Sequence, residues 1–168
     1  MNPTHSLSRL TRPSPLGELT LVATDAALVG LFMEVHGPDA LSAAGEERRT
    51  PLLAKVSAQL DEYFAGRREC FDVPVAPRGT EFQASVWQVL QRIPFGVTWS
   101  YAQVARALGN PKAVRAVGAA NGSNPISIII PCHRVIGANG SLTGYGGGLP
   151  RKRWLLAHEK TELPLVSG

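Results

Sequence analysis

The stretch that decides the fold is "SYAQVARALGNPKAVRAVGAANG", residues 100–122. Ser100 followed by Gln103 three residues later forms a capping box, which predicts that a helix begins there. Apolar residues continue at helical spacing, and Gly109 predicts the end of this helix. The rest of the stretch is again rich in helix-forming residues. The sequence therefore predicts two short helices joined by a tight turn.

The second helix of this pair has its own start signal, and a further helix precedes the pair. Asn110 as a cap and Pro111 at the first helical position predict that the second helix begins directly after the turn. Residues 80–96, "TEFQASVWQVLQRIPFG", predict a helix that starts with another capping box, formed by Thr80 and Gln83. Two short helices around a tight turn are typical of the helix-turn-helix motif, which many domains contain without binding DNA.

The charge of the chain is unevenly distributed. Residues 1–80 contain eight basic and ten acidic residues, whereas residues 81–160 contain nine basic residues and only two acidic ones, a net charge of +7. A basic half that also contains a helix-turn-helix motif indicates a polyanionic partner, and DNA is the one we expect. The alternative is a solvated basic face without a partner.

The N-terminal part predicts a small α+β unit. Residues 14–34 alternate apolar and polar side chains and predict a β-hairpin or the start of a β-meander, and residues 52–66 have helical spacing closed by a glycine. Residues 70–79 predict a short strand followed by a Pro/Gly linker. We therefore expect a supporting domain over residues 1–78 and a second domain over residues 79–168.

The end of the chain predicts a hairpin and a last helix. The stretch "RVIGANGSLTGYGGG", residues 134–148, contains Asn139-Gly140, a typical hairpin turn, and predicts the wing of a winged helix-turn-helix domain. "PRKRWLLAHEK", residues 150–160, predicts a helix with proline near its start.

Composition and cysteine content limit the class of protein. With 168 residues, 44% of them hydrophobic and 18% charged, the chain is typical of a folded protein with one ordinary domain or two small ones. It has no apolar stretch long enough to span a bilayer, and its first ten residues lack a signal-peptide core. We therefore expect a cytoplasmic protein with no membrane partner. Its two cysteines, Cys70 and Cys132, are expected to be free thiols, with Cys70 in the core.

The second cysteine lies in an unusual chemical setting. The apolar run at residues 126–130, which we expect to be a buried strand, is followed by Pro-Cys-His-Arg. A thiolate is the nucleophilic form of cysteine, and at its ordinary pKa little of it exists at neutral pH. His133 can accept the proton from Cys132, directly or through a water molecule, and Arg134 adds positive potential. The pattern indicates a nucleophile next to its base.

A histidine base needs a partner on its other ring nitrogen, and a carboxylate is the usual one. The second half of the chain offers two acidic residues up to position 160, namely Glu81 and Glu159. From the residues alone, either of them can be the third member.

These motifs resemble one known family. "GTEFQASVWQVL", "IPFG", "SYAQVARALGNPKAVRAVG", "IPCHRV" and "KRWLLAHE", which fall between about Gly79 and Glu159, are similar to the O6-alkylguanine-DNA alkyltransferases. The resemblance implies an α+β fold, with a small ribonuclease-H-like α/β unit followed by a winged helix-turn-helix domain. It also implies DNA repair by direct reversal: a single-turnover, irreversible transfer of an alkyl group from O6 of guanine to a cysteine, without a cofactor.

The resemblance assigns roles to five residues of the reaction site. Cys132 would accept the alkyl group, His133 would act through a water molecule as its base, and Glu159 would orient the histidine ring. Asn124 would hold the active-site turn by hydrogen bonds from its side chain. Tyr101 would crowd the phosphate on the 3′ side of the target nucleotide and promote its rotation out of the duplex, with its hydroxyl also near the base.

The resemblance also implies a DNA-binding surface. The family places the second helix of the pair in the minor groove, and Arg115 would enter the duplex and fill the gap left by the extruded nucleotide. Ala116 and Gly118 are small residues that would allow close approach of this helix, and Arg134 is a further expected DNA contact.

Four more residues are expected around the extruded base. Tyr145 and the amide of Gly146 would donate toward O6, and the carbonyl of Val135 would accept from the exocyclic amine. Lys152 matches a lysine near the thiol.

The expected partner is double-stranded DNA that contains O6-alkylguanine, bound by a monomer, with cooperative binding left open. No Cys/His cluster with metal-ligand spacing occurs, so we expect no metal. Two alternatives stay open: a DNA-damage sensor whose cysteine does no chemistry, and a Cys-His hydrolase, which would need an oxyanion hole.

Overall fold

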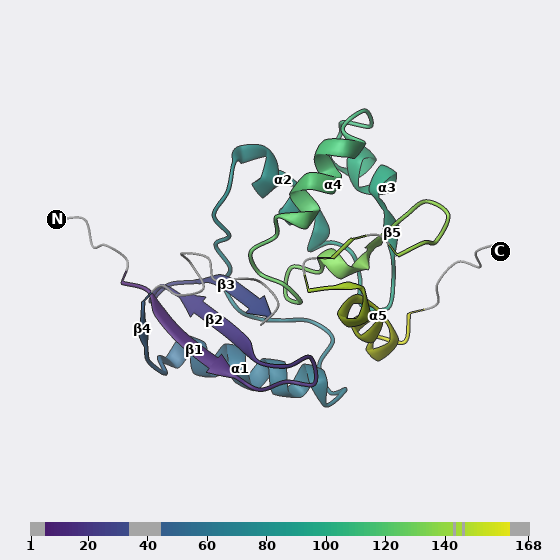
Figure 1. Ribbon diagram of the computed structural model, residues 1–168. Coiled ribbons are helices and arrows are strands. Elements are labelled where there is room, and N and C mark those ends of the chain that lie inside the picture. The colour runs from purple at the N-terminus through teal and green to yellow at the C-terminus, as the bar shows by residue number, and fades with distance from the viewer. Residues whose placement is uncertain (1–5, 34–44, 143, 146, 162–168) are drawn as a thin grey trace. The chain divides into compact units, whose positions relative to one another are not determined.

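The computed structural model describes residues 6–33, 45–142, 144–145 and 147–161, and the chain divides into two compact units (Figure 1). The first unit contains Met1–Arg78 together with Pro125–Ser127, and the second contains Gly79–Asn124 and Ile128–Gly168. The chain therefore returns to the first unit for three residues in the middle of the second.

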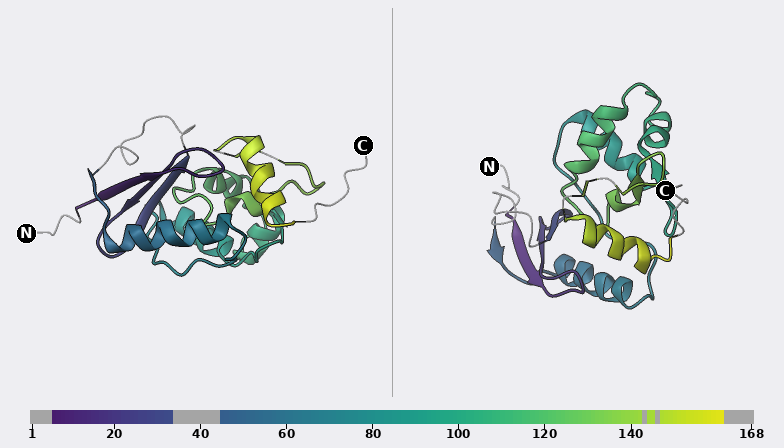
Figure 2. Two further views of the ribbon diagram at one scale, coloured as in Figure 1. Left: turned by 90° about the horizontal axis from the view of Figure 1, so that it is seen from below. Right: turned by 45° about the vertical axis from the view of Figure 1, so that its right-hand side comes forward.

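The first unit is a four-stranded sheet with a helix on one face (Figures 1 and 2). The sheet has the order β3-β2-β1-β4 and is formed by β1 (Ser8–Arg12), β2 (Leu19–Ala23), β3 (Leu28–Met33) and β4 (Glu46–Glu47). β2 pairs antiparallel with β3, as the predicted hairpin requires, and also antiparallel with β1, whereas β4 pairs parallel to β1. The sequence prediction missed β1 and the very short β4.

The helix of this unit, α1 (Pro51–Phe64), matches the prediction closely. Thr50 caps its N-terminus by accepting a hydrogen bond from the Leu53 amide, and Gly66 ends it at a φ of 78°. Its apolar stripe is fully buried, and each such leucine or valine contributes about 1.5–3 kcal/mol by burial. This stripe contains Leu53, Val56, Leu60 and Tyr63.

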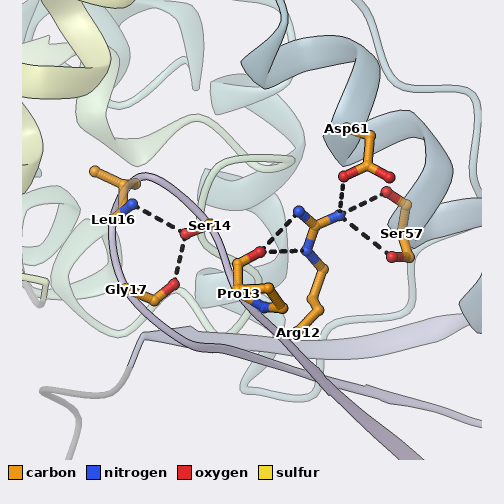
Figure 3. Close-up of polar contacts among 7 residues, drawn as sticks. All are labelled: Arg12, Pro13, Ser14, Leu16, Gly17, Ser57 and Asp61. Carbon is orange, nitrogen blue, oxygen red and sulfur yellow. Dashed lines mark hydrogen bonds and ion pairs between the residues drawn. The ribbon is translucent and has the colours of Figure 1, made fainter.

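An arginine at the end of β1 fastens the strand to α1 (Figure 3). Arg12 Nη1 donates to the Ser57 carbonyl and forms an ion pair of 2.7 Å with Asp61, and its Nε and Nη2 both donate to the Pro13 carbonyl. The neighbouring turn is closed by Ser14. These contacts hold the end of β1 against α1.

Two short segments pair with the outer edge of β3, and both correct the sequence prediction. Leu28 bridges to Val75, and Leu31 bridges to Ile126 through hydrogen bonds with the Pro125 carbonyl and the Ser127 amide. Each segment forms one isolated bridge and neither is a strand. Prolines at positions 74 and 125 remove backbone donors there, and Ile128 departs from extended geometry with a φ of 73°. The short strand predicted within residues 70–79 and the strand predicted over 126–130 are therefore wrong.

The second unit contains the helix-turn-helix pair. α2 (Glu81–Leu90) and α3 (Tyr101–Ala107) begin with the two predicted capping boxes, and both reciprocal hydrogen bonds are present in each. α4 (Val114–Gly122) packs against α2 and α3. The indole of Trp87, which is fully buried, donates to the Ala120 carbonyl at 2.8 Å and joins α2 to α4.

The start of α4 corrects the prediction for the second helix of the pair. Gly109, at a φ of 83°, donates to the Arg106 carbonyl, and Asn110 donates to the Ala105 carbonyl. These two bonds form a Schellman motif at the end of α3, so the backbone N–H of Asn110 belongs to the C-terminal cap of that helix. A turn follows, and α4 begins at Val114 without a side-chain cap.

The remaining elements of the second unit are short. β5 (Trp99–Ser100) pairs parallel with β6 (Val135–Ile136), which follows η1 (Cys132–Arg134), a 3₁₀ turn, and α5 (Leu149–His158) comes last. The predicted hairpin at Asn139-Gly140 forms a turn closed by the Gly137 amide and the Ser141 carbonyl, without strand pairing of its own among the residues described there. In the described part of the chain, no helix is long and apolar enough to cross a membrane.

Candidate active site

The backbone before Cys132 is bent twice within five residues. Ile128 is buried and has a φ of 73°, an outlier for a β-branched residue that costs about 1–3 kcal/mol. Pro131 has φ −82° and ψ 63°, and the Cys132 amide donates across it to the Ile130 carbonyl at 2.8 Å. This geometry is an inverse γ-turn. The two bends place Cys132 at the first residue of η1.

Two asparagines hold this bent segment from the end of α4. Asn124 Nδ2 donates to the Ile130 carbonyl at 2.8 Å, and Asn121 Nδ2 donates to the Cys132 carbonyl at 3.4 Å. The sequence resemblance assigned Asn124 to this position. It gave no role to Asn121, which lies on α4, whereas Asn124 follows the end of that helix.

The thiol of Cys132 is buried, with 5% of the residue exposed. Burial raises its pKa, and this effect outweighs the hydrogen bond from Asn124, the positive charge of Lys152 and a backbone hydrogen bond, which all lower it. The resting cysteine is therefore a protonated thiol, and a nucleophilic reaction requires that the proton be removed.

His133 and Glu159 lie in direct contact. His133 Nε2 is 2.8 Å from Glu159 Oε2, and both side chains are fully buried. Burial would raise the pKa of Glu159, but hydrogen bonds with His133 and Arg134 and the charges of both bring it well below its usual range. Glu81, the other acidic candidate, is exposed at the start of α2. The structure therefore brings Glu159, and not Glu81, to the histidine.

The histidine is a neutral imidazole at rest. Burial lowers the pKa of His133, and the neighbouring positive charges of Arg134 and Lys152 lower it further. Glu159 raises this pKa, but its effect is smaller than the sum of the others. Because an ionised carboxylate only accepts hydrogen bonds, the ring proton belongs on Nε2. Nδ1 is then a buried acceptor without a hydrogen-bond partner among the described residues. An unprotonated nitrogen of this kind can take a proton from a thiol or a water molecule.

Arg134 was expected to contact DNA and to add positive potential at Cys132, and the structure contradicts both expectations. The residue is 7% exposed, and its guanidinium bonds to Glu159 and to the Ile93 carbonyl. It is therefore not available at the surface as a DNA contact, and its charge is paired with Glu159. The cation that acts on the Cys132 thiol is Lys152.

Lys152 is buried on α5 next to the thiol. Its Nζ donates to the Val135 carbonyl at 2.7 Å, and burial lowers its pKa to about 8 in spite of the opposing effect of Cys132. The Val135 carbonyl, which was expected to accept from the base, thus already accepts one hydrogen bond. A carbonyl oxygen has a second lone pair for another donor.

The residues expected to contact DNA lie on α3 and α4. Arg115 and Ala116 are exposed on α4, and Tyr101 is half-buried at the start of α3. A Cβ at Gly118 would lie 3.9 Å from the Tyr101 ring, so the two helices place these residues face to face.

Three further expectations concern Tyr145, Gly146 and Cys70. Tyr145 is half-buried in the loop before α5, and Gly146 lies outside the described residues. Cys70 is exposed, which corrects its predicted place in the core. Among the described residues, no group of three or more His, Cys, Asp or Glu side chains could hold a metal ion.

The fold and the site define a class of protein: a two-unit α+β chain whose helix-turn-helix unit holds a buried cysteine beside a His-Glu pair. Residues 81–161 match the DNA-binding domain of 6-O-methylguanine DNA methyltransferase, and residues 9–77 match its ribonuclease-like domain. The chain belongs to this family.

Individual relatives agree over nearly the whole chain. A methylated-DNA–protein-cysteine methyltransferase of Mycolicibacterium paratuberculosis is 49% identical over 156 residues, covering 92% of this chain and 93% of the relative. The crystal structure of the O6-methylguanine methyltransferase of Mycobacterium tuberculosis is 46% identical, has a TM-score of 0.85, and covers 92% of this chain and 93% of that one. A structure of the same M. tuberculosis protein in complex with DNA has the same score and identity, with 94% and 95% covered.

Proposed function

We propose that the protein repairs DNA by transferring an alkyl group from O6 of guanine to Cys132. The observation that carries the proposal is the cluster of Cys132, His133 and Glu159, in which a buried thiol is followed by a neutral imidazole held by an ionised carboxylate. Relatives at 49% identity are methylated-DNA–protein-cysteine methyltransferases, and a solved relative binds DNA.

The transfer begins with removal of the thiol proton. His133 Nδ1 accepts it through a water molecule, while Glu159 stabilises the imidazolium that forms. The nearby charge of Lys152 and the hydrogen bond from Asn124 stabilise the thiolate. The sulfur then attacks the alkyl carbon in line with the carbon–oxygen bond.

The second part of the reaction balances the first. The carbon–sulfur bond forms as the carbon–oxygen bond breaks, and the electron pair of that bond stays on guanine. The proton taken from the thiol balances the one that the product guanine gains. Tyr145 and the Gly146 amide stabilise the departing oxygen. Because Cys132 ends as a thioether, which no neighbouring group can hydrolyse, each molecule reacts once.

The DNA is bound through α4. Arg115 is exposed there beside the small residues Ala116 and Gly118, which supports insertion of this helix into the minor groove. Guanine O6 lies inside the duplex, so the nucleotide has to rotate out, at a cost of a few kcal/mol. Tyr101, facing Gly118, promotes this rotation.

The test is a transfer experiment with duplex DNA that carries labelled O6-methylguanine in excess. One equivalent of label should appear on the protein. Cys132→Ala should abolish the transfer without loss of DNA binding, and Cys70→Ala, which removes the exposed thiol, should transfer fully. Binding without transfer by the unmodified chain would instead indicate a damage sensor, and continuous release of label into solution would indicate a hydrolase.

A further inference from the structure

All three guanidinium nitrogens of Arg134 are bonded inside the second unit. Its Nε donates to Glu159 Oε1 at 2.8 Å, its Nη2 donates to Oε2 at 3.1 Å, and its Nη1 donates to the Ile93 carbonyl at 2.7 Å. The ring of Phe95 lies 5.7 Å from the guanidinium carbon, within the range of a cation–π contact. The bidentate contact between the planar guanidinium and both oxygens of Glu159 fixes the orientation of the carboxylate.

The arginine joins three elements that are distant in sequence. Ile93 follows the end of α2, Arg134 itself belongs to η1, and Glu159 is the C-cap of α5. The turn after α2 also lies close to α5, because a Cβ at Gly96 would be only 3.3 Å from the Glu159 carbonyl oxygen. The Glu159 carboxylate is thus held at both of its oxygens by Arg134.

We propose that Arg134 is a positioning residue for alkyl transfer, which fixes Glu159 so that His133 is held neutral, with its proton on Nε2 and Nδ1 left as the acceptor. This inference rests on the proposed role of His133 as the base. Arg134 Nε donates to Glu159 Oε1, and Oε2 is shared between Arg134 Nη2 and His133 Nε2. Rotation of the carboxylate would break the arginine contacts, so the histidine ring is held in one orientation.

The charges around His133 explain why an arginine is required. Glu159 favours the protonated imidazole, whereas burial, Arg134 and Lys152 oppose it, and the Cys132 thiol nearby is neutral. Without Arg134, the whole negative charge of Glu159 would act on His133. The pKa of His133 would then rise against the effect of burial, and a smaller fraction of the rings would remain as acceptors for the proton of the thiol.

The kinetic test uses Arg134→Met in the full chain. The second-order rate of reaction is measured from pH 6 to 9 with free O6-benzylguanine, which needs no DNA binding. We expect the rate of the variant to be about tenfold below that of the wild type at pH 6.5 and to approach it at pH 9, since each pH unit below the pKa of the base reduces its free fraction about tenfold. Arg153→Met removes the same charge from an exposed site on α5 and should leave the profile unchanged. An equal fractional loss at every pH would overturn the proposal.

The imidazole of His133 offers a second measurement, by nitrogen NMR of labelled protein. The wild type should show neutral His133 with the proton on Nε2 between pH 6 and 8, and Arg134→Met should titrate in that range. A cationic ring or an Nδ1–H tautomer in the wild type overturns the proposal, even if Arg134→Met does not fold, and so does an unchanged titration in the variant. Absence of transfer by the wild type would refute the proposed function separately, because the tautomer is observed without any reaction.

Discussion

Replacing Glu159 by glutamine removes one negative charge from a fully buried cluster while keeping the length of the side chain. The carboxylate accepts hydrogen bonds from His133 and, through both oxygens, from Arg134. A glutamine has only one acceptor oxygen, so its amide NH₂ group would face a donor of His133 or Arg134. The guanidinium of Arg134 would also remain buried without a negative partner. Removing one partner of a buried ion pair destabilises a protein by about 3–5 kcal/mol.

The assay is urea unfolding of the full chain at pH 7. The matched control is Glu81→Gln, which removes the same charge from an exposed position in the first turn of α2, where it is worth about 0.3–1 kcal/mol. The free energy of unfolding should therefore fall several times more for Glu159→Gln than for the control. Equal losses in the two variants would refute the reasoning.

The dependence on pH gives the same prediction a second check. The pKa of Glu159 in the folded protein lies well below its value of about 4.3 in an unfolded chain. The ionised group therefore contributes its stability above about pH 4.3, and the contribution is lost as pH falls toward the folded pKa. The difference between wild type and Glu159→Gln should shrink below about pH 4. A difference that stays constant from pH 7 to pH 3 would contradict the assigned cause.

Three further predictions concern other parts of the second unit. Arg115→Ala should slow repair of duplex DNA far more than reaction with free benzylguanine, because only the duplex requires rotation of the nucleotide; equal losses would remove the proposed role. In a Cys132→Ala background, the free energy of unfolding measured by urea titration should rise from pH 8 to about pH 10. In this range Lys152 is protonated in the unfolded chain but, with a pKa of about 8, deprotonated in the folded protein. Lys152→Met should flatten this rise. Ile128→Gly should cost less unfolding free energy than Ile130→Gly, although both side chains are buried, because glycine relieves the positive φ only at position 128.

The local signals in the sequence were sufficient for α1, α2 and α3 and insufficient for the start of α4 and for the segment before the cysteine. The capping boxes of α2 and α3 act over three residues, so they could be recognised from sequence alone. The apolar run 126–130 has the composition of a strand, but Ile128 adopts a positive φ, which depends on tertiary contacts. Likewise, the side chain of Asn110 is typical of a helix N-cap, yet its backbone N–H donates to the Ala105 carbonyl and completes the end of α3.

In the site, residue types indicated the chemistry but not the direction of every side chain. The adjacency of Cys132 and His133 was visible, and the family resemblance identified Glu159. Arg134 was assigned to DNA because a basic residue in a basic half suggests a surface contact. Only the fold shows that α5 brings a buried carboxylate to it. For the same reason, the contact between Asn121 and the Cys132 carbonyl could not be inferred from spacing alone.

The three-residue excursion of the chain limits how its units can be separated in evolution or in the laboratory. Pro125–Ser127 belong to the first unit and hydrogen-bond with Leu31 of β3, and Cys132 follows only five residues later. A fragment that begins at Gly79 would retain the nucleophile but lose the strand that pairs with this segment. Recombination between homologous genes at the border of the units would combine β3 from one parent with the segment Pro125–Ser127 from the other. These two partners would not have evolved together. Exchange of whole genes avoids this mismatch, and the two units are expected to be inherited together.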